Sequence, residues 1–154
     1  MAKNQSLAIG DALPAIRLKN QDNEFVQLED YKGTPMVVYF YPKNNTSGCT
    51  AEACSFRDQF EDFKDTGALV FGISADSPTS HKAFQKKHRL PFTLLSDKGN
   101  VVRKQLGIKS NLLGLLPGRV TFVIDKSGVV QHTFSSQFDA KKHVKEALKV
   151  IQSM

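Results

Sequence analysis

Residues 35–54, PMVVYFYPKNNTSGCTAEAC, contain the segment around which the rest of the fold can be arranged. They begin with a run of β-branched and aromatic residues between two prolines, which predicts a buried central strand. A polar loop follows, in which Thr46 or Ser47 has the side chain of a helix N-cap. We expect a helix from Cys49 to Thr66, ended by Gly67 at its C-terminal cap. Cys49 would then lie in the first turn of a helix that follows a central strand.

The segments on both sides of this unit predict a mixed sheet covered by helices. Hydrophobic patterns and turn residues indicate a hairpin over 15–28, buried strands over 68–75 and 92–97, and a second hairpin over 119–134. Helical signals lie at 77–88, 100–107 and 139–152, where the last segment is amphipathic. The apolar segment 109–118, KSNLLGLLPG, is interrupted by Gly and Pro, so we expect a partly buried loop near the site. This order of strands and helices is typical of an α/β fold.

Length and composition are those of one ordinary domain. The chain has 154 residues, 40% of them hydrophobic, and no internal repeat or linker, so we expect a single domain over 1–154. Two cysteines are far fewer than a secreted disulfide scaffold carries, which favours a reducing compartment. No apolar run approaches the ~20 residues of a membrane span, so we expect no membrane segment. The net charge of +6 is spread along the chain and its densest cluster, KKHR at 86–89, ends a predicted helix, so we do not expect nucleic-acid binding.

The two cysteines face different sides of the predicted helix. At 100° per residue, Cys49 lies within about 40° of the apolar stripe, and Cys54 lies about 140° away toward the polar side. A buried cysteine is most often a small core side chain. At Cys49, however, the free N–H groups and the dipole of the helix N-terminus would stabilise a thiolate, and an ordinary thiol with a pKa of ~8.5 needs such help to react at neutral pH. We therefore predict a reactive Cys49.

The other candidate ligands and bases do not form a familiar catalytic spacing. The cysteine spacing is neither the C-x-x-C of a dithiol catalyst nor a usual zinc spacing. We expect each of the four histidines to be a solvated or partly buried surface residue, because they occupy separate places without a pairing spacing: His81, His88, His132 and His143. A metal site is therefore not expected, and no histidine stands out as the base of a cysteine hydrolase.

Pro42, Thr46 and Cys49 form the pattern P-x-x-x-T-x-x-C, and with this pattern the chain resembles the peroxiredoxins. It is most similar to their bacterioferritin-comigratory or Q-type subfamily, in which a second cysteine follows the first by five residues, as Cys54 does here. The resemblance extends over nearly the whole chain and includes FYPKNNTSGCTAEACSFRD, FGISADSPTSHKAF, LPFTLLSD and GRVTFVID. It implies a thioredoxin-like α/β fold, in which helices flank a central mixed sheet and an N-terminal β-hairpin extends it.

The resemblance also assigns roles to individual residues. Cys49 would be the peroxidatic cysteine, Cys54 the resolving cysteine, and Arg119 the arginine beside the thiolate. A cation at the start of an apolar strand is costly without a partner, which agrees with that role for Arg119. The hydroxyl of Thr46 could bond a peroxide or only cap the helix, and Pro42 could shield the sulfur or only end the strand.

Two further charged residues remain open. Glu52 matches the family pattern and could orient the pocket or only favour the helix N-terminus. Arg57 is a second candidate for the cation near the thiolate. Asp58 beside it and Glu61 at helical spacing indicate a surface ion pair instead, so Arg57 ranks behind Arg119.

By this resemblance the protein would reduce hydrogen peroxide and organic hydroperoxides through a cysteine sulfenic acid. An intrachain disulfide between Cys49 and Cys54 would follow, reduced by thioredoxin or a glutaredoxin-like dithiol, with no metal or prosthetic cofactor. The family also implies a monomer in a bacterial cytoplasm or a plastid interior. The alternatives are a general disulfide oxidoreductase, which the absence of C-x-x-C disfavours, and a noncatalytic binding or chaperone protein with inert thiols.

A disulfide between these two cysteines is incompatible with an intact helix. In an ideal α-helix the Cα atoms of Cys49 and Cys54 would lie about 8.6 Å apart. A disulfide requires less than ~7 Å and converging Cβ vectors. We therefore predict that the start of the helix unwinds when the disulfide forms.

Overall fold

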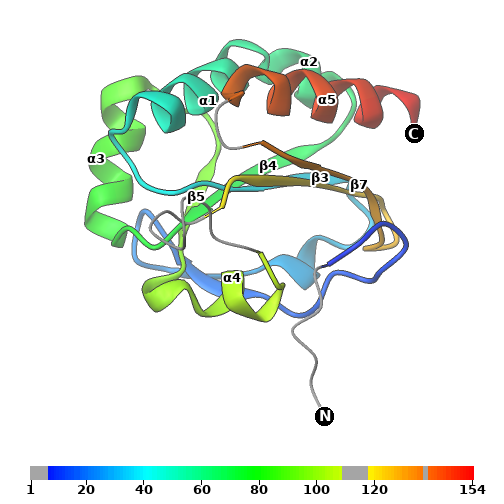
Figure 1. Cartoon of the computed structure of the whole chain (residues 1–154), viewed down its shortest axis with the longest axis horizontal. Helices are drawn as coiled ribbons and strands as arrows, with labels where there is room; N and C mark the ends of the chain where they lie inside the picture. Colours follow the sequence, from blue (N-terminus) through cyan, green and yellow to red (C-terminus); the bar gives the residue numbers. More distant parts are fainter. Residues whose placement is uncertain (1–6, 109–117, 137–138) are drawn as a thin grey trace.

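The computed structural model describes residues 7–108, 118–136 and 139–154. Within these ranges its centre is a seven-stranded mixed sheet with the strand order β2-β1-β5-β4-β3-β6-β7 (Figure 1). The strands are β1 (Arg17–Asn20), β2 (Phe25–Gln27), β3 (Met36–Phe40), β4 (Leu69–Ser74), β5 (Thr93–Ser96), β6 (Val120–Ile124) and β7 (Val130–Ser135). The helices are α1 (Ser47–Asp58), α2 (Phe60–Asp65), α3 (Pro78–His88), α4 (Val101–Gln105) and α5 (Ala140–Ser153), with short 3-10 helices at Leu28–Tyr31 and Lys98–Asn100.

β3 lies in the interior of the sheet, between β4 and β6, because all of its side chains are suited to burial. Its five residues are buried, as expected for a β-branched and aromatic run covered on both faces. It pairs in parallel with β4 and antiparallel with β6, so both of its edges are hydrogen-bonded. Its side chains alternate, with Val37 and Tyr39 in one core and Val38 and Phe40 in the other. The loop that follows β3 therefore starts from a firmly held strand.

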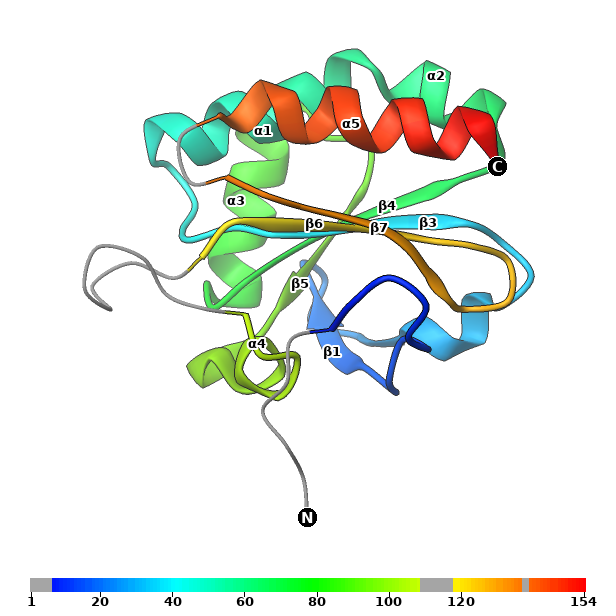
Figure 2. The same ribbon diagram turned by 45° about the vertical axis from the view of Figure 1, so that its right-hand side comes forward.

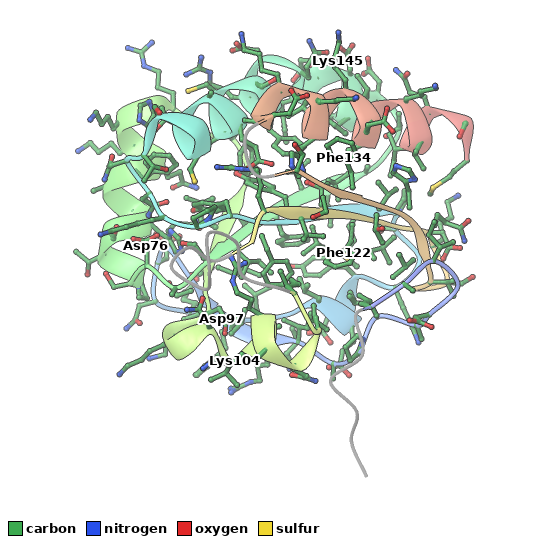
Figure 3. All side chains as sticks on the ribbon, viewed as in Figure 1. Asp76, Asp97, Lys104, Phe122, Phe134 and Lys145 are labelled. Atoms are coloured by element: carbon green, nitrogen blue, oxygen red, sulfur yellow. The ribbon has the colours of Figure 1, made fainter. Side chains whose placement is uncertain are left out.

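Helices cover both faces of this sheet. α1, α2 and α5 form a layer over one face, whereas α4 and the first 3-10 helix lie on the other side (Figure 2). α3 packs against β5 and β1. Phe134 of β7 lies on the α5 side of the sheet and Phe122 of β6 on the α4 side (Figure 3). Each face therefore buries its own apolar core, which supplies most of the stabilisation of such a layered fold.

The strands and helices expected from the sequence are present, with one difference in the helix that carries the cysteines. The helix expected over Cys49–Thr66 begins earlier, at Ser47, and breaks at Gln59, whose backbone angles (φ −98°, ψ 7°) depart from the helix. Across the break, the buried rings of Phe56 and Phe63 lie with their centroids 5.6 Å apart. Both rings belong to the same apolar core, so the break is compatible with the burial of each.

The boundaries of the neighbouring elements follow the predicted capping residues. Gly67 follows α2 with φ 81°, the left-handed conformation that a terminating glycine adopts. Ser77 caps α3 by accepting a hydrogen bond from the N–H of Ser80 at 3.1 Å, and Pro78 is the first residue of that helix. The loop expected over 109–118 lies outside the described residues except for Gly118, so its place near the site stays a prediction.

Candidate active site

Cys49 lies in the first turn of α1 and its side chain is buried. The residue is 1% exposed, and its thiol is free. α1 begins two residues earlier, so the unpaired N–H groups and the positive end of the helix dipole lie at this turn. The loop from β3 therefore delivers Cys49 to a buried position at a helix N-terminus, as the sequence predicted.

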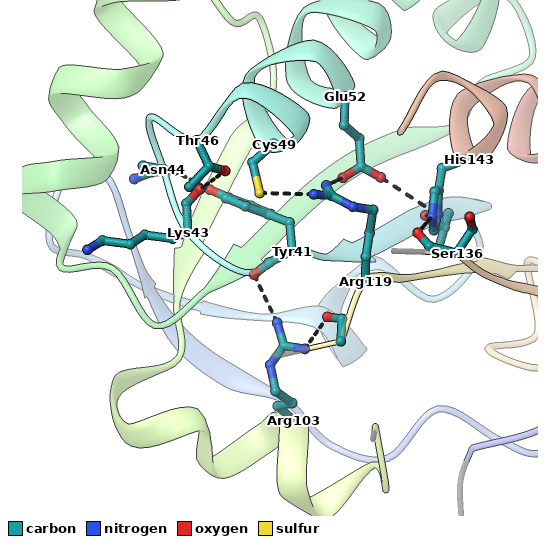
Figure 4. A network of polar contacts seen from close by, with 12 residues as sticks. Tyr41, Lys43, Asn44, Thr46, Cys49, Glu52, Arg103, Arg119, Ser136 and His143 are labelled. Atoms are coloured by element: carbon teal, nitrogen blue, oxygen red, sulfur yellow. Dashed lines mark hydrogen bonds and ion pairs between the residues drawn. The ribbon is translucent and has the colours of Figure 1, made fainter. Parts of the chain in front are cut away.

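Arg119 places its guanidinium beside that sulfur (Figure 4). Its Nη2 atom donates a hydrogen bond to Sγ of Cys49 at 3.3 Å. Arg119 directly precedes β6, and β6 pairs with β3, which leads into the loop before α1. The sheet thus joins two residues that are 70 positions apart in the chain. Arg119 occupies the place beside Cys49 that the sequence analysis gave it.

Glu52, one turn after Cys49 on α1, holds the guanidinium in place. Nη1 of Arg119 donates to Oε1 of Glu52 at 2.6 Å, and the two side chains are only 4% and 0% exposed. Burial alone lowers the pKa of Arg119, but the Glu52 carboxylate and the Cys49 sulfur outweigh it, so this pKa lies above its usual value. Burial raises the pKa of Glu52 to about 8, and Arg119 limits that rise. The sequence left two roles open for Glu52, and its contact with Arg119 fits the first of them, which is to orient the pocket.

His143 of α5 extends this network on the far side of Glu52. Its Nδ1 atom lies 3.7 Å from Oε2 of Glu52 and accepts a hydrogen bond from the Thr121 hydroxyl at 2.8 Å. Its Nε2 atom donates to the carbonyl of Ser136 at 2.7 Å, which places the proton of the neutral ring on Nε2. Burial lowers the pKa of His143 to about 4. The expectation of a surface histidine is therefore wrong for His143, because its position falls on the buried stripe of α5.

Asn44 fastens the loop between β3 and α1 to neighbouring elements. Its Nδ2 group donates to Nδ1 of His81 at 2.9 Å, and its Oδ1 atom accepts from the Tyr41 hydroxyl at 2.7 Å. His81 in turn donates from Nε2 to the carbonyl of Leu95 at 3.0 Å, and the N–H of Asn44 donates to Asp76 at 2.9 Å. His81 is fully buried, so the expectation of a surface histidine is wrong here too. Its hydrogen bonds make it part of the support for the loop that leads to Cys49.

Thr46 and Pro42 lie in the same loop. Thr46 is exposed and has the extended backbone of an N-cap residue (φ −87°, ψ 153°). Its hydroxyl donates to the carbonyl of Lys43 at 3.0 Å and does not cap α1. Pro42 is half-buried and follows Tyr41, whose N–H donates to the carbonyl of Ile73 on β4 at 3.0 Å. Pro42 therefore ends the strand pairing.

Two residues that the sequence analysis did not single out shape the pocket. Arg103 of α4 is buried and donates from Nη2 to the carbonyl of Tyr41 at 2.9 Å and from Nη1 to the carbonyl of Gly118. It therefore ties the loop before the thiol to the residue before Arg119, and burial lowers its pKa to about 10. Gly48 leaves open the space in which a Cβ atom would lie 3.0 Å from Nη2 of Arg119. Arg103 could have been found from the sequence, because it is a cation on the buried side of a short helix.

Cys54 and Arg57 lie on a different side of α1 and face α3. Cys54 is a half-buried free thiol whose Sγ atom lies 3.8 Å from Nδ1 of His88. Arg57 forms the expected ion pair with Asp58 at 3.0 Å, and its Nη1 atom also donates to the carbonyl of His88 at 2.8 Å. Glu61, the other expected partner, lies on α2 beyond the break in the helix. Arg57 therefore belongs to the contact between α1 and α3, and the two cysteines point apart as predicted.

The surroundings of Cys49 suit nucleophilic chemistry at sulfur. A helix N-terminus and a guanidinium both stabilise negative charge on a sulfur atom. The same guanidinium can stabilise an oxygen atom that leaves with negative charge, because it is already held in position by Glu52. Burial strengthens both effects, since little water screens the charges.

The described part of the chain shows neither a cluster of metal-binding side chains nor a membrane-spanning helix. Over residues 7–108, 118–136 and 139–154, no three His, Cys, Asp or Glu side chains gather in a way that could hold a metal ion. No helix in these ranges has the length and apolar character needed to cross a membrane.

The fold and the site together define a thiol peroxidase built on a thioredoxin-like sheet, and solved structures of such enzymes superpose on it. The peroxidoxin BcpB from Mycobacterium tuberculosis matches with a TM-score of 0.88 and 35% identity, over 96% of this chain and 98% of that chain. The C47S mutant of PrxQ from Xylella fastidiosa matches with a TM-score of 0.88 and 28% identity, over 97% of this chain and 98% of that chain.

Sequence comparison gives the particular family. The AhpC/TSA family model matches residues 9–133. The chloroplastic peroxiredoxin Q of Populus jackii is 56% identical over 145 residues, which are 94% of this chain and 68% of that protein. The chloroplastic peroxiredoxin Q of Arabidopsis thaliana is 53% identical over 144 residues, 94% of this chain and 67% of that protein. The chain belongs to the AhpC/TSA family, and within it to the peroxiredoxins of the Q type.

The expectations of a thioredoxin-like fold and of a peroxiredoxin are thereby confirmed. The protein is a thiol peroxidase that reduces hydroperoxides with electrons from thioredoxin or a similar dithiol, and it needs no prosthetic group. The two alternatives left open by the sequence, a general disulfide oxidoreductase and a noncatalytic binding protein, are not the class to which these relatives belong.

Proposed function

We propose that Cys49 is the peroxidatic cysteine and Cys54 the resolving cysteine of this peroxidase. The thiolate of Cys49 attacks one oxygen of the peroxide, and the O–O bond breaks. The other oxygen leaves as hydroxide or alkoxide and takes a proton from solvent to give water or an alcohol, while Cys49 becomes a sulfenic acid. Cys54 then displaces the sulfenic hydroxyl, which leaves as water, and an external dithiol reduces the resulting disulfide by exchange.

The observation that carries this assignment is the hydrogen bond from Arg119 to the buried sulfur of Cys49 at 3.3 Å. It joins a permanent cation to a thiol at a helix N-terminus, which is where a reactive cysteine is expected. Cys54 has a more exposed position on the α3 side of the helix. That exposure suits a thiol whose disulfide must be reached by a protein reductant.

The other residues of the site support these two cysteines. Arg119 stabilises the charge that develops on the departing oxygen, and Glu52 positions Arg119 through the ion pair at 2.6 Å. The Thr46 hydroxyl, one turn before the thiol, binds the peroxide, and Pro42 shields the sulfur from water. Arg57 acts in the contact between α1 and α3, as its bond to the carbonyl of His88 indicates.

We also infer that the chain acts as one domain and as a monomer. A single sheet joins β2 near the start of the described chain to β7 near its end, which supports one domain. The monomer rests on what the resemblance to the Q-type subfamily implies. Sedimentation at the mass of one chain, in both redox states, is the expected result. A stable dimer in either state would contradict this inference.

A reducing compartment is the setting that we propose, either the cytoplasm or a plastid interior. Two relatives named above are chloroplastic, which favours the plastid. Two cysteines in 154 residues are also far fewer than a secreted disulfide scaffold carries, which favours a compartment that keeps cysteines reduced. We expect the protein to act without nucleic acid or a membrane, and cell fractionation tests its place directly.

Two serine variants test the cysteine roles in a thioredoxin-coupled peroxidase assay. Cys49→Ser is expected to abolish turnover, because the attacking sulfur is gone. Cys54→Ser is expected to consume one equivalent of peroxide and then stall at the sulfenic acid or a higher oxidation state, detected by mass spectrometry. Sustained wild-type turnover by Cys54→Ser with thioredoxin would disprove the resolving role, and any turnover by Cys49→Ser would disprove the peroxidatic role.

A further inference from the structure

Cys54 is paired with an imidazole that the steps above do not use. Its Sγ atom lies 3.8 Å from Nδ1 of His88, within the range of a hydrogen bond that involves sulfur. His88 is the last residue of α3, and Cys54 lies on α1, so the contact joins two helices. Both residues are half-buried, which shelters the contact without closing it to solvent.

Neighbouring residues contact both the backbone and the ring of His88. Nη1 of Arg57, one turn after Cys54 on α1, donates to the carbonyl of His88 at 2.8 Å and satisfies one of the unpaired carbonyls at the end of α3. The imidazole makes an edge-on contact with the ring of Phe84, with 4.9 Å between the ring centroids. The next residue, Arg89, has the left-handed backbone (φ 52°) that ends the helix. The backbone of His88 is therefore held by Arg57, its ring packs on Phe84, and its Nδ1 atom faces Sγ of Cys54.

The groups around His88 keep its imidazole neutral at neutral pH. Burial lowers the pKa of His88, and the positive charges of Lys87 on α3 and Arg57 on α1 lower it further. Asp58, the acidic group beside them, is paired with Arg57 at 3.0 Å. A neutral imidazole has one ring nitrogen that can accept a proton. His88 can therefore take a proton from a thiol that contacts it.

We propose that His88 is the base that activates Cys54 for disulfide formation, an inference that rests on the resolving role proposed above. The thiolate is the nucleophile in this reaction, so the thiol must first lose its proton. Nδ1 of His88 takes that proton, and the Cys54 thiolate attacks the sulfenic sulfur of Cys49. The S–S bond forms, the S–O bond breaks, and the leaving hydroxide takes up a proton and departs as water. No further oxidant is needed, because the peroxide has already oxidised Cys49.

The same contact sets the order of events. While α1 is intact, Cys54 rests against His88 and points away from Cys49, so the thiol already contacts its base before the helix opens. When the start of α1 unwinds and Cys49 comes within reach, His88 takes the thiol proton and the thiolate attacks. Arg57 keeps its own turn of α1 bound to the end of α3, which limits the unwinding to the residues before it.

Stopped-flow kinetics of single turnovers separates the two chemical steps in the wild type, His88→Asn and His88→Ala. Asn carries an acceptor at about the position of Nδ1 but has no titratable group. Oxidation of Cys49 by hydrogen peroxide should keep its wild-type rate in both variants. Disulfide formation, identified by mass spectrometry, should slow by about 10²-fold near neutral pH, the usual size of a general-base contribution. The deficit should shrink as pH rises, because hydroxide then ionises the thiol without help, and added imidazole should restore the rate of His88→Ala.

Two control variants distinguish a base from a packing residue. Arg57→Met removes the bond to the carbonyl of His88 and one positive charge near the imidazole, but it leaves the imidazole in place. Disulfide formation should therefore still follow the titration of a histidine, with the midpoint moved to higher pH, and should not respond to added imidazole. His132→Asn changes a histidine paired with Glu146 at 3.3 Å and should leave both steps unchanged. A deficit in the His88 variants that is equal at all pH values, or that imidazole does not reduce, would overturn the proposal. An unchanged rate of disulfide formation would overturn it as well. If mass spectrometry finds no disulfide between Cys49 and Cys54 in the oxidised wild type, the resolving role itself fails.

Discussion

Gly48 and Arg119 occupy complementary space, because a Cβ atom at position 48 would lie 3.0 Å from Nη2 of Arg119. Few real Cβ atoms approach another atom so closely, so a side chain there would push against the guanidinium. That guanidinium is held from its other nitrogen by Glu52 at 2.6 Å. A glycine in the first turn of α1 therefore lets the cation reach the sulfur of Cys49 while it stays bound to the carboxylate.

Gly48→Ala should slow the reaction of the protein with peroxide while leaving its stability intact. A displacement of the guanidinium by a few tenths of an ångström weakens its hold on the reacting atoms, and we expect a loss of about tenfold in the second-order rate constant. Alanine has a better helix propensity than glycine, so the free energy of unfolding should stay the same or rise by up to about 1 kcal/mol. Ser47→Ala, an exposed change in the same turn, is the matched control. A wild-type oxidation rate in Gly48→Ala would show that the guanidinium needs no such room.

Arg119→Met should slow the attack on peroxide by about 10²- to 10³-fold, the usual effect of losing one preorganised donor. Arg57→Met should have a much smaller effect, because Arg57 bonds the carbonyl of His88 in the contact between α1 and α3. Stopped-flow measurement of the second-order rate constant compares the two variants. Equal losses would mean that the hydrogen bond from Arg119 to Cys49 has no special part in the reaction.

The stability of Arg119→Met needs a separate control. Burial already raises the pKa of Glu52 to about 8, so without Arg119 this side chain is protonated at neutral pH, and its unpaired polar atoms destabilise the fold by about 1–3 kcal/mol. As the pH rises, Glu52 becomes an uncompensated buried charge and the loss of stability grows. The double variant Arg119→Met/Glu52→Gln has no ionisable group there and should recover that part of the free energy of unfolding. It should not recover the rate of peroxide reduction. Recovery of both would show that Arg119 acts only on the fold.

His143→Gln should flatten part of the dependence of stability on pH. The pKa of His143 in the folded protein is lowered to about 4 from 6.5, so between these values the unfolded chain binds more protons than the folded one. This residue therefore contributes stability that is present above about pH 6.5 and lost as the pH falls toward 4. Urea unfolding at pH 7 and pH 4.5 should show an acid loss that is larger in the wild type than in the variant, on the order of 2 kcal/mol. An equal acid loss in the two proteins would contradict the prediction.

Glu52 also titrates in this pH range. The informative quantity is therefore the difference in acid loss of stability between the wild type and His143→Gln. Burial raises the pKa of Glu52 from 4.5 to about 8, so the folded protein binds the extra proton over that range. Its contribution is present at low pH and is lost as the pH rises, which opposes the effect of His143. The pH dependence of the free energy of unfolding of the wild type therefore combines two opposing contributions. The comparison with His143→Gln isolates the contribution of the histidine.

Oxidation should unwind the start of α1. Both cysteines lie within this one helix, Ser47–Asp58, in the reduced protein. Phe56, two residues after Cys54, is buried and stacks on Tyr39 with 4.5 Å between the ring centroids, so we expect the helix to stay docked from that residue onward. Amide hydrogen exchange over residues 49–57 measures this, with protection that falls on oxidation and returns on reduction. Unchanged protection in a protein whose Cys49–Cys54 disulfide is verified by mass spectrometry would disprove the unwinding.

The order of the strands and helices was predictable because its signals are local. The apolar run that becomes β3, the cap at Ser77 and the glycine at 67 act on their own neighbours in the chain, whatever lies across the sheet. The place of Cys49 in the first turn of a helix follows from the same short-range rules. The sequence also allowed Arg119 to be ranked ahead of Arg57 as the cation beside Cys49, because a cation at the edge of an apolar strand needs a buried partner.

The sequence by itself therefore determined the fold class, the place of Cys49 at the start of a helix and the arginine that lies beside it. Only the tertiary structure decided which side chains surround them. The burial of Glu52 depends on β6 and α5, the positions of His81 and His143 depend on partners in other elements, and the contact of Cys54 with His88 joins residues 34 positions apart. The break of the cysteine helix at Gln59 is likewise seen only in the structure, where the phenylalanines on either side of it pack into one core. Hydrogen bonding and burial act between groups that are close in space, so a residue pattern along the chain cannot specify them until the sheet has brought distant segments together.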